Sequence, residues 1–307
     1  MPNIVAVFLF NHRFEKNLPK LDELYRDRFK ERRYIMPFAR SERPDVISVF
    51  ETSWNFSGHL AQAWPRFRVE GASHYVIIAD DLILNPRLNE ENIVDELNIF
   101  EDGGYIKSIA SIDRNRYLWY RALLESIRLD ELESGFDYVE ELPSANEALK
   151  RFEAMGIPMA FPGPPRWREV RLKPHRVGAW NYLRWIGRRT SYPLLYGYSD
   201  FIIVPAHAMP SFIRSCGVFA ALNIFAEVAV PTSLALSVDK IQSEMEFGEH
   251  FEPPAKRRQA ALEGLELWGT EQIDAFVKKA DGSLAKLLSE FPDDRLYVHP
   301  VKLSQFC

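Results

Sequence analysis

Residues 74–82 read His74-Tyr75-Val76-Ile77-Ile78-Ala79-Asp80-Asp81-Leu82, and they are the most informative segment of this sequence. Its apolar run is short and rich in β-formers, which predicts a strand over residues 75–79 that runs straight into the two aspartates. In open α/β sheets, ligands bind at the carboxyl ends of the strands. The acidic pair is therefore the first candidate for a functional site.

Strand and helix patterns alternate ahead of this stretch. The unbroken apolar run IVAVFLF predicts a first strand buried on both faces. Further predicted elements are a helix over 18–33, short strands over 34–38 and 46–50, and a helix over 57–67 that Ser57 caps. This alternation predicts an α/β protein with a mostly parallel sheet flanked by helices.

The remainder of the chain repeats the alternation less regularly. Helical spacing covers residues 117–128, 145–155, 211–225 and 271–291, while residues 201–204 and the tail 296–303 have strand character. The longest apolar run, 216–237, contains Glu227 in its middle. Because a charge in lipid is costly, we expect a buried helix that leads into a strand or second helix, and no transmembrane segment.

Composition narrows the class of protein. The 307 residues are 47% hydrophobic and 26% charged, as in a soluble globular protein, and the net charge of −5 argues against nucleic acid as a partner. The two cysteines, Cys216 and Cys307, are too few for a disulfide framework. The N-terminus lacks the basic region of a signal peptide, so we expect a cytoplasmic protein.

The two aspartates suit a divalent cation. Adjacent carboxylates offer hard oxygen ligands for Mg²⁺ or Mn²⁺, and such an ion can bridge to a diphosphate and neutralise it as it leaves. The alternative is structural, with Asp80 capping the next turn and Asp81 solvated. The pair alone does not decide between these interpretations.

The order strand, helix, strand, helix, strand, acidic pair resembles the nucleotide-sugar half of GT-A glycosyltransferases, with their DxD-type motif. The segment from Trp54 to Trp64 is similar to the helix that precedes that motif. The resemblance implies a Rossmann-like GT-A fold, with Asp81 as the direct metal ligand and Asp80 at sugar or ribose hydroxyls. Phe10 and His59 are further candidate donor contacts. The sequence departs from the family in having Ala79-Asp80-Asp81 rather than a strict Asp-x-Asp.

The tail Tyr297-Val298-His299-Pro300-Val301-Lys302 resembles the C-terminal segment of many GT-A enzymes. By that resemblance, His299 completes the metal site and Lys302 contacts the diphosphate. An imidazole ligand favours Mn²⁺ over Mg²⁺. The alternatives are an exposed tail with an incidental histidine and lysine, or His250 as the metal ligand.

The acceptor side depends on two acids. The loop 191–200 resembles the acceptor loop of inverting GT-A families, and Glu227 in Ala226-Glu227-Val228 aligns with their acidic base, with Glu in place of Asp. A carboxylate base is needed because a hydroxyl is a poor nucleophile at neutral pH. Asp200 is the rival base or an acceptor-hydroxyl ligand. The structural alternatives are an ion pair of Glu227 with Arg214, and Asp200 as a turn residue.

Arginines and tryptophans alternate over residues 166–189. Aromatic rings stack on sugars and arginines hold phosphates or carboxylates, so this stretch could bind an anionic glycan or a lipid diphosphate at a membrane surface. The same residues would suit nucleic acid. The alternative is a solvated basic face over core tryptophans.

Together these patterns predict a metal-dependent hexosyl- or pentosyltransferase. It would take a nucleoside-diphosphate sugar donor and a glycan or glycolipid acceptor, with inversion and with peripheral membrane contact as an option. Residues 1–98 would bind the donor, and 99–190 would form a helical and loop insertion that is a candidate acceptor-binding region. Residues 191–307 would be the acceptor and base half that completes the same GT-A domain. The alternatives are a nucleotidyltransferase, disfavoured because no glycine-rich loop follows the first strand, and a non-catalytic glycan- or nucleic-acid-binding module.

Overall fold

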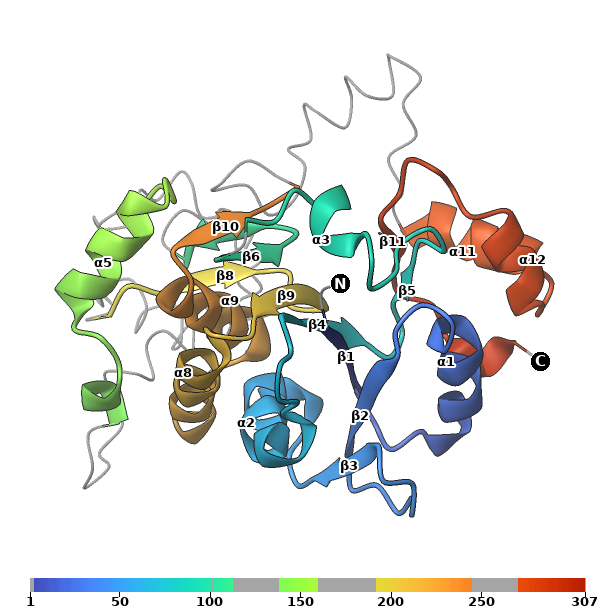
Figure 1. The fold of residues 1–307 in the computed structure, drawn as a ribbon, viewed down its shortest axis with the longest axis horizontal. Helices are drawn as coiled ribbons and strands as arrows, with labels where there is room; N and C mark the ends of the chain where they lie inside the picture. The colour runs from blue at the N-terminus through green and yellow to red at the C-terminus, as the bar shows by residue number, and fades with distance from the viewer. Residues whose placement is uncertain (1–2, 101, 113–137, 160–191, 245–269, 307) are drawn as a thin grey trace, which may run out of the picture.

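A computed structural model describes residues 3–100, 102–112, 138–159, 192–244 and 270–306 of the chain. Its centre is a seven-stranded sheet in the order β10-β6-β9-β4-β1-β2-β3 (Figure 1). The strands are β1 (Ile4–Leu9), β2 (Glu31–Pro37), β3 (Val46–Val49), β4 (His74–Ala79), β6 (Gly103–Ile106), β9 (Phe201–Pro205) and β10 (Lys240–Gln242). Within this sheet β9 runs antiparallel to its neighbours, and the other strands are parallel to one another. The predicted α/β class and mainly parallel sheet are confirmed.

Helices cover both faces of this sheet. Side chains of β1 alternate between two buried clusters, with Val5 and Val7 in one and Ile4 and Ala6 in the other. The first cluster packs against α2 (Phe56–Phe67), α5 (Ala145–Ala154), α8 (Met209–Ala221) and α9 (Ala226–Ser237). The second packs against α1 (Leu18–Tyr25), α11 (Thr270–Lys279) and α12 (Leu284–Ser289). A sheet buried on both faces explains the unbroken apolar runs of its strands.

Three local predictions were wrong in detail. The first helix ends at Tyr25 rather than Arg33, because Glu31–Arg33 pair with Val5–Val7 as the start of β2. Ser57 does not cap α2, since the helix already begins at Phe56 and Ser57 is fully buried. The predicted helix 271–291 is two helices, separated by positive φ angles at Asp281 (51°) and Gly282 (74°).

The long apolar run 216–237 forms the end of α8 and the whole of α9, as two successive buried helices. In the parts of the chain that the structure describes, none of the helices combines the length and hydropathy required to cross a membrane. The run is apolar because α8 and α9 pack against each other and against the sheet.

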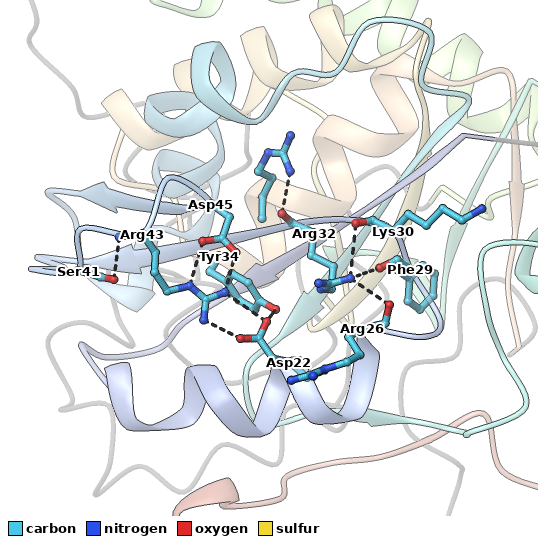
Figure 2. A network of polar contacts seen from close by, with 10 residues as sticks. Asp22, Arg26, Phe29, Lys30, Arg32, Tyr34, Ser41, Arg43 and Asp45 are labelled. Carbon is cyan, nitrogen blue, oxygen red and sulfur yellow. Dashed lines mark hydrogen bonds and ion pairs between the residues drawn. The ribbon is translucent and has the colours of Figure 1, made fainter.

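A polar network fixes α1 over the sheet (Figure 2). The Arg43 guanidinium donates to Asp22 on α1 at 2.6 and 3.2 Å and to Asp45 at 3.0 and 2.6 Å. The Tyr34 hydroxyl of β2 donates to the same Asp22 carboxylate at 2.7 Å. Burial would raise the pKa of Asp22, but the bonds from Arg43 and Tyr34 outweigh it and lower that pKa.

Part of the range 99–190 belongs to the central sheet. Strand β6 pairs with β9 and β10, and β7 (Ile109–Ser111) forms a small antiparallel sheet with β8 (Leu195–Gly197). The predicted helix 117–128, the arginine- and tryptophan-rich stretch 166–189 and His250 lie outside the described residues.

The topology gathers several loops at one edge of the sheet. All the mutually parallel strands end at this edge, and the antiparallel β9 begins there, because Ile78 near the end of β4 pairs with Phe201. The segment after β3 leads into α2 at the same edge. Asp80, Asp81 and Asp200 therefore share an edge before any side chain is considered.

Candidate functional site

The C-terminal tail is held against the segment that follows the acidic pair. Strand β11 (Tyr297–Val298) pairs with β5 (Ile83–Leu84), as Figure 1 shows. The Asn85 amide donates to the carbonyl oxygens of Pro292 and Arg295 at 3.1 and 2.7 Å. The Val301 N–H donates to the Asp81 carbonyl oxygen at 2.7 Å. These bonds bring His299 to the carboxyl edge of the sheet.

His299 and Asp81 face each other across this contact. Nε2 of His299 lies 3.3 Å from Oδ1 of Asp81, and the Tyr198 hydroxyl lies 2.5 Å from Nδ1 on the other side of the ring. Oδ1 of Asp81 is buried and accepts no hydrogen bond within the described structure. Burial would lower the pKa of His299, but the carboxylates of Asp81 and Asp200 outweigh it and raise that pKa.

Asp80 is the more buried member of the acidic pair, with 6% of its surface exposed. Its carboxylate accepts a hydrogen bond from the Asn11 N–H at 3.1 Å and a longer one from the Asn17 amide at 3.5 Å. Burial and the nearby charge of Asp81 raise the pKa of Asp80 to about 7 against these bonds. Asp80 thus fastens the loop after β1 to the end of β4, rather than capping the next turn.

Asp200 and Glu227 form a second acidic pair near the first. Burial raises the pKa of Asp200, and the charge of Asp81 adds to this while His299 opposes it. Burial and the charge of Asp200 raise the pKa of Glu227 to about 7, again opposed by His299. Arg214, the ion-pair partner considered for Glu227, instead contacts Glu141. The two carboxyls and the imidazole therefore interact electrostatically in one place.

Lys107 is a site residue that the sequence did not point to. It follows β6, and its Nζ lies 5.3 Å from the ring centroid of Tyr198 and 5.0 Å from that of Tyr297. The two tyrosine rings are stacked, with centroids 6.1 Å apart. The ammonium group acts electrostatically on both Asp200 and His299. It is the cationic counterpart of the acids at this edge.

The remaining predicted residues occupy three different settings. Lys302 is exposed and follows Val301, which is bonded to Asp81. The Phe10 side chain is fully buried against Tyr34. His59 is fully buried within α2, where its Nε2 lies 3.3 Å from the Glu51 carbonyl oxygen. The structure therefore does not bring the side chains of Phe10 and His59 to Asp81 and His299.

The donor atoms at Asp81 and His299 fit a cation that other ligands would complete. A buried carboxylate oxygen without a hydrogen bond faces an imidazole nitrogen, and this oxygen and nitrogen pair suits Mn²⁺. Among the described residues, His, Cys, Asp and Glu side chains nowhere gather in groups of three or more that could hold a metal ion. An ion at Asp81 and His299 would take its further ligands from a diphosphate and water.

Comparisons with known proteins add little to this geometry. No protein-family model matches the chain. No curated protein matches it either. Among solved structures, the chain aligns with the crystal structure of core-mannan synthase A (CmsA/Ktr4) from Aspergillus fumigatus in its Mn/GDP form, with a TM-score of 0.31 and 9% identity, over 78% of this chain and 70% of that one.

Proposed function

We propose that this protein is a metal-dependent glycosyltransferase that moves a sugar from a nucleoside-diphosphate sugar to a hydroxyl group. The observation that carries the proposal is the contact between Asp81 and His299 at the carboxyl edge of the sheet, with Asp200 and Glu227 beside it. Metal-ligand atoms and groups suited to proton transfer thus lie at the edge where α/β sheets bind ligands. Neighbouring residues would meet the separate requirements of glycosyl transfer.

Asp81 and His299 would hold Mn²⁺ or Mg²⁺, whose charge neutralises the diphosphate of the donor. Lys107, on the stacked tyrosines, would add a second positive charge on the same side of the site. Cationic groups at a leaving diphosphate stabilise the charge that develops on it. Lys302 is exposed on the tail next to Val301, and we keep it as a further diphosphate contact. Asp80 would fix the loop after β1 below the donor.

Glu227 is the acid that we assign as base. With a pKa of about 7, its carboxyl is partly ionised at neutral pH and holds a proton well once it has taken one. The bond between the acceptor oxygen and the anomeric carbon would form as the bond from that carbon to the diphosphate oxygen breaks, and the hydroxyl proton would pass to Glu227. Asp200 would position the sugar. Its carboxyl interacts electrostatically with Asp81, His299 and Lys107. This single displacement inverts the anomeric centre.

Thermal denaturation with nucleoside diphosphates tests the proposal. We expect UDP, GDP, CDP, ADP or TDP to raise the melting temperature only when Mn²⁺ is present, because a ligand of the native state stabilises it by mass action. Asp81→Asn should abolish this shift. The matched control is Asp102→Asn. Asp102 also faces a histidine, since its Oδ1 lies 3.9 Å from Nε2 of His207, but this pair is at the other edge of the sheet. No shift with any diphosphate, or an equal loss in both variants, would overturn the proposal.

A further inference from the structure

Two half-buried aromatic rings meet where two helices begin. The ring centroids of Trp54 and Phe225 are 4.3 Å apart, with their planes inclined by 38°. Trp54 lies in the short 3-10 helix η2 (Ser53–Asn55) before α2, and Phe225 is the residue before α9. Neither ring is fully buried, and the segment that carries Trp54 follows β3 at the carboxyl edge. The aromatic pair therefore lies on the same edge as the acids.

The two segments are tied together beside the rings. The Asn55 amide nitrogen donates to the Asn223 side-chain oxygen at 3.2 Å. Asn223 itself adopts a left-handed φ of 54°, which turns the chain between α8 and α9. The two segments that carry the rings are thus linked before a ligand binds, which lowers the entropic cost of binding there.

Glu227 stands two residues beyond Phe225, in the first turn of α9. Its carboxylate is half-buried, and within the described ranges it makes no hydrogen bond or ion pair. A partly buried carboxylate without a polar partner is costly to the fold, and such a cost is typical of groups kept for a ligand. Its electrostatic neighbours Asp200 and His299 belong to the site already described.

We propose that Trp54 and Phe225 form a platform for the pyranose ring of a carbohydrate acceptor, with Glu227 accepting a hydrogen bond from the hydroxyl that reacts. This inference rests on the proposed glycosyl transfer. A pyranose has a face of C–H groups, which packs on aromatic rings, and a rim of hydroxyls, which bind carboxylates. A phosphate would be repelled by Glu227 and Asp200, and a purely apolar ligand would leave the Glu227 charge desolvated.

Saturation-transfer NMR with simple glycosides tests the platform. The probes are methyl α-mannopyranoside, methyl β-glucopyranoside, methyl β-galactopyranoside and N-acetylglucosamine, each added with Mn²⁺ and the nucleoside diphosphate that stabilises the protein most. We expect at least one sugar to receive saturation chiefly on the C–H protons of one ring face. Trp54→Ala should weaken the binding of that sugar about tenfold or more. Trp54→Phe, which keeps a smaller ring, should retain part of the binding.

A second tryptophan supplies the matched control. Trp64 is also half-buried and packs against Phe67 and Tyr75, but it lies further along α2. Trp64→Phe should leave sugar binding unchanged. Sugar binding that is insensitive to Trp54, or diphosphate binding without binding of any of these sugars, overturns the platform and leaves the proposed function standing. Sugar binding that depends on Trp54 without any metal-dependent diphosphate binding keeps the platform and overturns the proposed function.

Discussion

The Tyr198 hydroxyl lies 2.5 Å from Nδ1 of His299, on the side of the ring opposite Asp81. A histidine that binds a metal through one nitrogen is commonly oriented by a hydrogen bond at the other. Here that partner comes from the segment between β8 and β9, about a hundred residues before the tail. Its ring is stacked on Tyr297 and covered by Lys107, so the position of the hydroxyl is fixed by packing.

We predict that Tyr198→Phe weakens Mn²⁺ binding by about tenfold while the fold is kept. The ring and its stacking survive this change, and only the hydroxyl that orients His299 is lost. Free Mn²⁺ can be titrated by electron paramagnetic resonance, with and without a nucleoside diphosphate. Tyr297→Phe is the control, because the Tyr297 hydroxyl is buried without a hydrogen-bond partner in the described structure. Equal affinities in the two variants would remove Tyr198 from this positioning role.

We predict that Glu227→Gln stabilises the protein at about pH 8 by about 3 kcal/mol. The folded protein raises the pKa of this carboxyl from 4.5 to about 7. Between those values the native state holds a proton that the unfolded chain releases, so the free energy of unfolding falls as pH rises. Above about pH 7 the penalty is complete, and below about pH 4.5 it is absent. Urea unfolding of the wild-type protein and the variant, at about pH 8 and below about pH 4.5, measures this penalty in the free energy of unfolding.

Glu147 provides a control of opposite sign for this experiment. It is exposed, and hydrogen bonds with Ser144 in the cap of α5 lower its pKa, so its charge stabilises the fold at neutral pH. Glu147→Gln should therefore bring no gain in stability at about pH 8. If Glu227→Gln shows no gain either, or a gain that persists at low pH, the carboxyl is not held in the environment described here.

The sequence predicts strands well where both faces are buried. Strand β1 is apolar at every position and β4 at every position after His74, so their strand character is visible without any partner. The sequence does not predict the start of β2, because Glu31, Arg32 and Arg33 are polar and continue a helical spacing, yet pairing with β1 makes them a strand. Tertiary pairing overrides local propensity in such a segment.

The candidate site also contains residues that the sequence predicts and residues that it does not. The acidic pair is visible in the sequence because it ends a predicted strand, whereas His299 is predicted only through the resemblance of the tail to GT-A enzymes. Lys107 gave no signal at all, since nothing near it in sequence hints at chemistry. It reaches the site because β6 pairs with β9, which places the residue after β6 beside the segment that carries Tyr198. Such a neighbour is set by sheet order, which a single sequence does not display.

We predict that Lys107→Met weakens the binding of a nucleoside diphosphate in the presence of Mn²⁺ by about tenfold. The substitution keeps most of the packing on Tyr198 and Tyr297 and removes the charge. Isothermal titration calorimetry measures the affinity. Lys240→Met is the matched control, because Lys240 also sits over an aromatic ring, Phe100 at 4.6 Å, but at the start of β10 and so at the opposite edge of the sheet. A loss of affinity in both variants would point to net charge rather than to a diphosphate contact at Lys107, and no loss in either would exclude that contact.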